Sequence, residues 1–284
     1  PALLIGSHSD TQPEGGWLDG ALGVVYGLEI VRAFSEDPST QKLAVDAVSW
    51  QDEEGNFLSC LGSRSWCGVL DPNIEKTCMG RDGEILQAAL TRVGLDKTAR
   101  IQIEDGRYEG YLEAHIEQGN YLEDAGEKIG IVSAIVGIRG LTIVFTGEQN
   151  HAGTTTMARR RDAATALFDM ASRINEQFPN IANDRTVWTI GNVVIEPGAA
   201  SIIPGRAELT LQFRDQDEEI LDQLENIVGF IATDINAKGI VKVEIEPARA
   251  PIIPSKMSGK FRTEMQKSAE LIVPNKWRHM PSAA

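Results

Sequence analysis

The chain of 284 residues carries 27 Lys and Arg against 41 Asp and Glu, which gives a net charge of −14 at pH 7. This acidic balance, without any basic run, argues against nucleic acid and anionic membrane surfaces as partners, and no apolar stretch approaches the length of a membrane span. Cys60, Cys67 and Cys78 are odd in number and lack CxxC spacing, which favours reduced thiols and a cytoplasmic location. The chain starts without Met and stops without an obvious closing element, so we expect a piece of a longer protein, cut at both ends.

The first apolar segment, residues 1–5, predicts a buried strand, and the helical spacing of apolar residues over 21–34 predicts a helix. His8 and Asp10 therefore stand at the exit of a strand, and Asp19 at the N-cap of the helix. Ligand sites in α/β sheets gather at such strand ends. This stretch is the start of a predicted metal site.

Two further strands are predicted in the first half of the chain. Residues 43–50 form one, followed directly by Glu53 and Glu54, and residues 111–116 form the other, carrying His115 and followed by Gln118. A helix is expected over residues 83–94, closed by Gly94. Acidic and histidine side chains thus recur at the carboxyl edge of the predicted sheet.

The pattern changes after about residue 129. The predicted elements follow the order βαββαβ, which is that of a ferredoxin-like unit: strands 138–146, 186–195, 206–214 and 240–246, with helices 160–178 and 217–237. A helix over 259–269 and a strand or loop over 276–280 complete the chain. The simplest organisation is an α/β catalytic domain, residues 1–133 and 251–284, interrupted by an inserted βαββαβ domain, residues 134–250.

Four residues at separate strand ends have the side chains of a metal site: His8, Asp19, Glu54 and His115. Histidine with carboxylate is the ligand chemistry of Zn, Mn, Co or Ni, and two ions sharing a carboxylate suit hydrolysis. Taken singly, each residue is more typical of a surface carboxylate or a structural histidine. Glu53 can act as a general base beside the ligand Glu54, although two adjacent glutamates in a loop are usually a solvated acidic face.

The inserted domain adds two candidates. His151 precedes a Gly- and Thr-rich turn and could donate to a developing oxyanion, although the same pattern is typical of helix-capping threonines beside a bystander histidine. Arg214 ends a predicted strand and could bind a carboxylate through two parallel hydrogen bonds, although an ordinary surface arginine is more common.

Together these motifs resemble the hydantoinase/carbamoylase family of dinuclear metal amidohydrolases, within the zinc aminopeptidase–deacylase clan. The resemblance covers nearly the whole chain through GSHSDTQPEGGWLDGALGV, QDEEGNFLSCLGSRSWCG, EAHIEQG, IVGIRG, NHAGTTTMARRRDA, EPGAASIIPGRAELTLQFR and HMPSAA. It implies a zinc-aminopeptidase-like α/β catalytic domain, an inserted ferredoxin-like lid domain that forms a homodimer, and two divalent ions per subunit.

Carried over by position, the resemblance implies metal ligands at four residues. His8 and His115 would bind the first ion, Glu54 the second, and Asp19 would bridge both. Glu53 would be the general base.

The remaining roles implied by the resemblance concern substrate and support. Asp10 would be the carboxylate that orients His8, while Gln118, Ser201 and Arg214 would bind substrate, with Arg214 holding its carboxylate. His151 would reach across the dimer interface to the substrate's carbonyl oxygen.

The chain departs from the family pattern at three places. Ser201 stands where an Asn is usual, beside the carboxylate clamp, and Thr156 replaces a Pro. The fifth ligand of the family is a His in a Ser-Gly-Ala-Gly-His-Asp run expected after Ser282, and the chain stops at Ala284, before that His. We therefore expect the second metal site to lack this ligand in the chain as given.

The resemblance implies hydrolysis of a linear C–N amide, with the carbamoyl group of N-carbamoyl-L-amino acids or β-ureido acids as the preferred substrate. The alternatives are an allantoate or ureidoglycolate amidohydrolase, an aminoacylase or dipeptidase of the same clan, and a metal-depleted dimeric binding protein. The TQPEGG segment after Asp10 resembles the carbamoylase and ureidopropionase members of the family more than the allantoate hydrolases.

Overall fold

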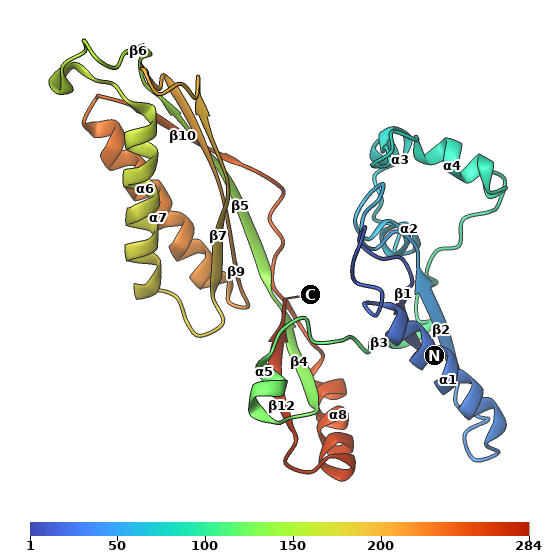
Figure 1. Ribbon diagram of the computed structural model, residues 1–284. Coiled ribbons are helices and arrows are strands. Elements are labelled where there is room, and N and C mark those ends of the chain that lie inside the picture. The colour runs from blue at the N-terminus through green and yellow to red at the C-terminus, as the bar shows by residue number, and fades with distance from the viewer. Residues whose placement is uncertain (284) are drawn as a thin grey trace. The chain divides into compact units, whose positions relative to one another are not determined.

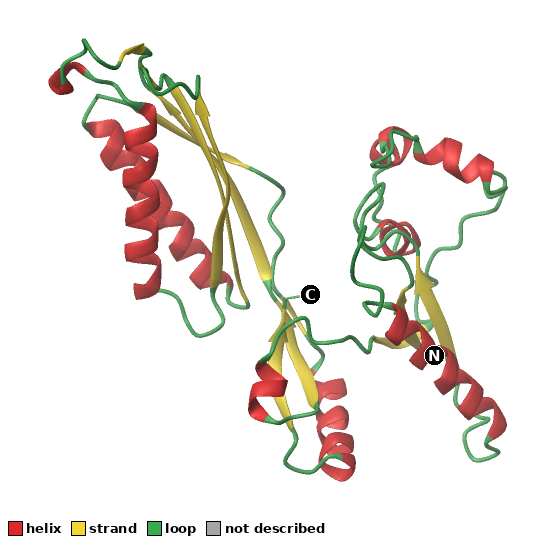
Figure 2. Ribbon diagram, in the orientation of Figure 1, coloured by secondary structure: helices red, strands yellow, loops and turns green. Residues whose placement is uncertain are grey.

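The computed structural model describes residues 1–283; Ala284, the last residue of the expected segment 251–284, lies outside them. The chain divides into two compact units, Pro1–Gln118 and Gly119–Ala284. Both units mix helices and strands, as expected for an α/β protein (Figure 2). None of the helices within residues 1–283 is both long and apolar enough to cross a membrane.

The first unit is built on a parallel sheet of three strands in the order β2-β1-β3 (Figure 1). These strands are β1 (Ala2–His8), β2 (Val45–Trp50) and β3 (Tyr108–Leu112). In a parallel sheet all carboxyl ends meet at one edge, so the loops that follow the three strands lie close together. The predicted site residues are in these loops.

Helix α1 (Ala21–Glu36) packs on this sheet through glycines. Gly23 and Gly27 are its buried residues, and a Cβ on Gly23 would lie 2.5 Å from the carbonyl oxygen of Ala114, so the backbones approach more closely than any side chain allows. Val25 and Leu28, by contrast, are 60% and 59% exposed. The apolar spacing predicted the helix, but its glycine face meets the sheet.

Two predicted boundaries in this unit were wrong. Strand β3 ends at Leu112 instead of residue 116, so His115 lies beyond the strand, in the following loop. The helix expected over 83–94 is the shorter α4 (Leu86–Arg92), with Gly94 at positive φ just after its end, as expected. The short helices α2 (Leu61–Trp66) and α3 (Pro72–Thr77) carry too few residues for a periodic pattern.

The second unit contains the predicted βαββαβ domain, here defined as β5 through β10. Its elements are β5 (Gly137–Thr146), α6 (Ala163–Gln177), β7 (Val187–Glu196), β9 (Arg206–Asp215), α7 (Glu218–Ala237) and β10 (Lys242–Pro247). The strands form an antiparallel sheet in the order β10-β5-β9-β7, and α6 and α7 lie side by side on one face of it (Figure 1). The ferredoxin-like expectation is confirmed.

The side chains of β9 divide between the two faces of this sheet. Ala207, Leu209, Leu211 and Phe213 are fully buried against the helices. The intervening residues, which alternate to the open face, are polar: Arg206, Glu208, Thr210, Gln212 and Arg214. This alternation places Arg214 on the face away from the helices.

The rest of the second unit is a small sheet in the order β11-β4-β12 with helix α8. Its elements are α5 (Tyr121–Ala125), β4 (Ile129–Ile135), β11 (Ser255–Lys256), α8 (Gly259–Ile272) and β12 (Trp277–Ser282). Strand β4 was not predicted, whereas α8 and β12 match the helix and the strand or loop expected at the end of the chain.

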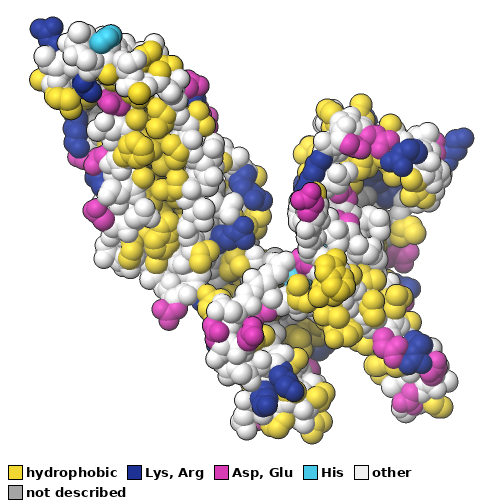
Figure 3. Space-filling model, viewed as in Figure 1, with side chains coloured by type: hydrophobic (Ala, Val, Ile, Leu, Met, Phe, Trp, Pro, Cys, Tyr) yellow, Lys and Arg dark blue, Asp and Glu magenta, His cyan; other side chains and the backbone are white. Residues whose placement is uncertain are grey.

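Charged side chains of both signs are interspersed on the face drawn in Figure 3. On the βαββαβ domain, Arg173 lies 2.7 Å from Asp234 and Arg139 lies 3.0 Å from Asp222. The aspartates of these pairs are exposed, and surface ion pairs contribute about 0–1 kcal/mol each, so the apolar core supplies most of the stability of the domain.

Candidate metal centre

The carboxyl edge of the parallel sheet brings the predicted ligands together. His8 is the last residue of β1, Glu53 and Glu54 follow β2, and His115 follows β3. His8 and Asp19 are 3% and 6% exposed, which is unusual for two polar side chains so close to each other. All of these residues belong to the first unit.

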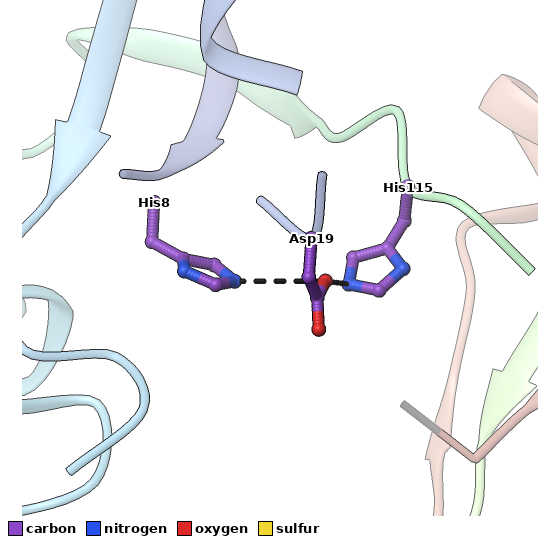
Figure 4. Close-up of side chains that lie close together, drawn as sticks. All are labelled: His8, Asp19 and His115. Atoms are coloured by element: carbon purple, nitrogen blue, oxygen red, sulfur yellow. Dashed lines mark ion pairs between the residues drawn. The ribbon is translucent and has the colours of Figure 1, made fainter. Parts of the chain in front are cut away.

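Both histidines turn the same ring nitrogen toward Asp19 (Figure 4). The Nε2 atom of His115 lies 2.7 Å and that of His8 lies 4.0 Å from Asp19 Oδ1. Each Nδ1 faces a backbone carbonyl oxygen instead, at 3.0 Å for His8 and 2.7 Å for His115. A carbonyl only accepts hydrogen bonds, so the network assigns the proton to Nδ1 and leaves the Nε2 lone pairs facing the carboxylate.

This arrangement fits a metal ion. Asp19 Oδ1 is buried and has no hydrogen-bond donor within residues 1–283. Acceptors that face one another without a proton are unfavourable, and a divalent cation satisfies all of them at once. Metal-binding histidines characteristically donate their other ring N–H to a carbonyl, as His8 and His115 do.

A second group of possible ligands adjoins the first. One ligand atom each from His8, Glu53 and Glu54 lie within 4.8 Å of one another. Glu53 Oε2 is 3.5 Å from His8 Nε2, while Cys60 Sγ lies 3.5 Å from Glu53 Oε1 as a donor. Burial raises the pKa of the Glu53 carboxyl, with the attraction of His8 opposing it. A glutamate whose pKa is raised in this way is suited to accept a proton.

The sequence-based prediction of Asp19 as the N-cap of α1 was wrong by one residue. The N-cap is Gly20, at φ 68°, without a side-chain cap hydrogen bond. A Cβ built on Gly20 would lie 2.5 Å from three ring atoms of His8. Because Gly20 takes the cap position and leaves this space for the ring, the carboxylate of Asp19 is free to face the histidines.

Replacing Gly20 by Ala is therefore expected to displace the His8 ring and to weaken metal binding by about tenfold or more. Competition titration against a chelator measures the change. Gly15→Ala is the matched control, since a Cβ on Gly15 has no atom within 4 Å. Equal metal affinity in both variants would contradict the role of Gly20.

Two other predicted residues, Asp10 and Gln118, make contacts in addition to those expected. Asp10 Oδ1 lies 3.6 Å from His8 Nδ1, and the backbone carbonyl of Asp10 lies 3.0 Å from the same nitrogen. Through Oδ2, the carboxylate of Asp10 also accepts the backbone N–H of Glu54 at 3.0 Å. The side-chain amide of Gln118 donates to Asp19 Oδ2. In this structure Asp10 thus supports Glu54 through its side chain, and Gln118 supports Asp19.

His151 lies in a short ribbon formed by β6 (Asn150–His151) and β8 (Ile202–Ile203). Its Nδ1 accepts the backbone N–H groups of Gly153 at 3.0 Å and Thr154 at 3.2 Å. These bonds assign the ring proton to Nε2, so His151 presents an N–H donor.

Within one chain Ser201 lies beside His151 and not beside Arg214. The carbonyl of Ser201 accepts the N–H of Ala152 at 2.9 Å, close to the Arg206 end of β9. Arg214 stands eight residues further along this strand, which is about 26 Å at ~3.3 Å per residue. The sequence motif joined Ser201 and Arg214 because they are near in the sequence, but an extended strand separates them.

The side chain of Arg214 is held at the other end of β9. Its Nε donates to Gln212 Oε1 at 3.0 Å and its Nη1 to the carbonyl of Ala283 at 3.1 Å. Because a guanidinium carries several N–H donors, it can keep such contacts and also bind a carboxylate.

Several residues that support the site were not predicted from the sequence. Buried Ser7 donates to Glu113, and Tyr111 donates to the same carboxylate at 2.8 Å. Arg160 donates to the carbonyl of Ala152 at 2.6 Å and so steadies the loop of His151. Glu113 directly follows β3 and lies two residues before His115, so its place after a strand was the signal that could have identified it.

Comparison with known proteins agrees with this geometry. Residues 4–283 match the family described as peptidase family M20/M25/M40. The chain is 33% identical over 261 residues to an N-carbamoyl-L-amino acid amidohydrolase of Geobacillus stearothermophilus, covering 90% of this chain and 63% of the relative. It is 32% identical over 258 residues to an allantoate amidohydrolase of Bacillus subtilis, covering 89% and 62%.

Among solved structures, an amidase of the hydantoinase/carbamoylase family from Burkholderia phymatum is 45% identical, with a TM-score of 0.94. The match covers 100% of this chain and 70% of that protein. The chain thus spans a little over three fifths of the length of the two curated relatives. The family match, the similarity to this amidase and the His–Asp–His cluster identify the chain as a member of the M20/M25/M40 peptidase family and, within it, of the hydantoinase/carbamoylase family of amidases.

Proposed function

We propose that the protein carrying this chain hydrolyses a linear C–N amide, with the carbamoyl group of N-carbamoyl-L-amino acids or β-ureido acids as its substrate. The observation that carries the proposal is the cluster in which His8 and His115 turn their Nε2 atoms toward the carboxylate of buried Asp19. The identity to an N-carbamoyl-L-amino acid amidohydrolase supports the choice of substrate.

The proposed cofactor is a pair of divalent ions per subunit, Zn, Mn, Co or Ni. His8, His115 and Asp19 would hold the first ion, and Asp19 with Glu54 would contribute to the second. Bound at these residues, the ions polarise the substrate carbonyl and make water a better nucleophile. The three free cysteines support a cytoplasmic location.

In the proposed reaction, Glu53 accepts a proton from the water that attacks the ureido carbonyl carbon. The proton then passes to the amino-acid nitrogen as its bond to this carbon breaks, which releases the amino acid. The carbamic acid left behind breaks down to carbon dioxide and ammonia. One water is consumed, and the raised pKa of Glu53 suits both halves of this proton transfer.

His151 and Ser201 are proposed to act on the site of a second subunit. His151 offers an Nε2–H that can donate to the carbonyl oxygen of the substrate as negative charge develops on it. Arg214 would bind the substrate carboxylate, yet about 26 Å of strand β9, from Arg206 to Arg214, separates it from His151 within one chain. Two copies joined through the βαββαβ domain would let both residues serve one small substrate.

This proposal keeps the division expected from the sequence. Residues 1–133 and 251–284 belong to the catalytic domain, and residues 134–250 form the domain that dimerises and closes as a lid. Gln118 adds an amide beside Asp19, within reach of a substrate at that carboxylate.

Arg214→Ala is expected to raise KM by about 10- to 100-fold with a smaller change in kcat, because it removes a charge-assisted contact to the substrate carboxylate. Steady-state kinetics measure both constants. Arg206→Ala is the matched control, since Arg206 lies on the same face of β9 at its other end. An unchanged KM in Arg214→Ala would remove this residue from the carboxylate site.

The proposed function is tested by measuring metal content together with ammonia release from N-carbamoyl amino acids, ureidopropionate and allantoate, with Mn or Zn added. Metal binding with ammonia release from the carbamoyl or ureido substrates is the expected result. Release from allantoate alone would favour the second candidate, allantoate or ureidoglycolate hydrolysis, which the similarity to an allantoate amidohydrolase and a ureidoglycolate hydrolase supports.

Two further outcomes would overturn the proposal. Turnover of N-acyl amino acids or dipeptides without ammonia release would indicate an aminoacylase or dipeptidase of the same family. The absence of both metal binding and turnover would indicate a dimeric binding protein that has lost its metal.

A further inference from the structure

Glu54 is held by a residue pair that the proposed chemistry does not use. Gln12 Nε2 donates to Glu54 Oε2 at 2.6 Å and to the backbone carbonyl of Glu54 at 3.2 Å. Arg81 Nη2 donates to Gln12 Oε1 at 3.1 Å and approaches the same Glu54 carbonyl at 3.4 Å. The two side chains thus form a chain of hydrogen bonds that ends on the Glu54 carboxylate.

Arg81 determines the orientation of the side-chain amide of Gln12. A side-chain amide has an accepting end and a donating end, and only the accepting oxygen can face a guanidinium. With Arg81 on Oε1, the NH₂ group of Gln12 must face Glu54. The carboxylate therefore always meets a donor there, which a freely rotating amide would not guarantee.

The carboxylates around Glu54 explain why a fixed hydrogen-bond donor matters there. Asp10, Asp52, Glu53 and Glu54 all lie in this loop region, and carboxylates crowded together repel one another. The backbone N–H of Glu54 is already fixed by Asp10 at 3.0 Å. With its main chain and one carboxylate oxygen held, Glu54 keeps a single orientation beside His8 and Glu53.

We propose that Gln12 and Arg81 are positioning residues for Glu54: Arg81 orients the Gln12 amide, and the amide orients the carboxylate for the second metal ion. This inference rests on the proposed function, because it takes Glu54 as a ligand of that ion. Partners that orient a metal ligand in this way are typically worth about 10- to 100-fold in metal affinity.

The test measures metal affinity and stoichiometry in the full chain by chelator competition, with Co²⁺ absorption as a spectroscopic signature of the ligand geometry. Gln12→Leu and Arg81→Ala are expected to weaken the more weakly bound ion by about 10- to 100-fold and to leave the other ion unchanged. Arg81→Lys, which keeps a cationic donor, is expected to recover part of the loss. Arg92→Ala is the matched control, because Arg92 pairs with Glu84 and not with Gln12 or Glu54.

The double variant Gln12→Leu/Arg81→Ala tests whether Arg81 acts on Glu54 through Gln12. If Arg81 acts through Gln12, Arg81→Ala adds little to Gln12→Leu, whereas additive losses would overturn the relay. Thermal unfolding of each variant verifies that the fold is kept, and Gln12→Glu, of the same size but repelling Glu54, gives an independent variant with the same expected loss.

The variant Glu54→Ala distinguishes the positioning role of Gln12 and Arg81 from the role of Glu54 as a metal ligand. If Glu54→Ala loses one ion while Gln12→Leu and Arg81→Ala bind as the wild type does, the positioning role is overturned and the proposed metal site stands. If Glu54→Ala itself binds metal as the wild type does, Glu54 is no ligand, and the proposed ligand set fails together with this inference.

Discussion

Replacing Glu53 by Gln is expected to lower kcat by about 10²- to 10⁴-fold while the metal content stays unchanged. Gln has the size of Glu, so the contact with Cys60 and the packing near His8 can persist, but an amide cannot take up a proton from the attacking water. Ammonia release from the preferred substrate, measured beside metal analysis of the same sample, checks both halves of this expectation.

The metal measurement distinguishes the two roles open to Glu53. The carboxylate of Glu53 lies with a ring nitrogen of His8 and the carboxylate of Glu54 in a possible ligand group, so Glu53 could bind an ion instead of moving a proton. Loss of one ion in Glu53→Gln would assign it as a ligand, and retained turnover would remove it as the base. Cys60→Ala is a useful neighbour control, because it deletes the contact to Glu53 Oε1 without changing the carboxylate.

Much of the fold could be predicted because its signals are local and strong. The βαββαβ order follows from alternating and helical apolar patterns, and Asp162 and Asp217 cap α6 and α7 through their side chains. The ligand cluster was predictable for a topological reason, since parallel strands put their following loops at one edge. Strand β4 was missed although it is seven residues long and mostly apolar, which is the pattern of a strand.

The remaining details depend on contacts that the sequence does not express locally. Gly20 is the cap of α1 because the ring of His8 occupies the space of a Cβ, which depends on a residue twelve positions earlier. Ser201 and Arg214 are close in sequence, yet strand β9 carries them to opposite ends of a sheet. Arg81 meets Gln12 across 69 positions, and neither residue belongs to a metal-ligand pattern.

Mixing two impaired variants, His151→Ala and Arg214→Ala, is expected to restore activity at a substrate concentration far below the raised KM of Arg214→Ala. If His151 serves the site of its partner while Arg214 serves its own, a mixed dimer contains one site with both residues intact. Random exchange of subunits in a twofold dimer then restores about a quarter of the wild-type activity. The expectation follows from the separation of these residues along β9, which prevents one chain from placing both on a small substrate.

Two controls make the mixing experiment decisive. Wild type mixed with the double variant His151→Ala/Arg214→Ala is expected to lose activity as mixed dimers form, because the wild-type subunit then receives no His151 from its partner. If both residues served the same chain's site, this mixture would keep the activity of its wild-type subunits, and the two single variants would recover nothing. Size-exclusion chromatography before and after mixing verifies that subunits have exchanged, so a negative result bears on the position of His151 and not on slow exchange.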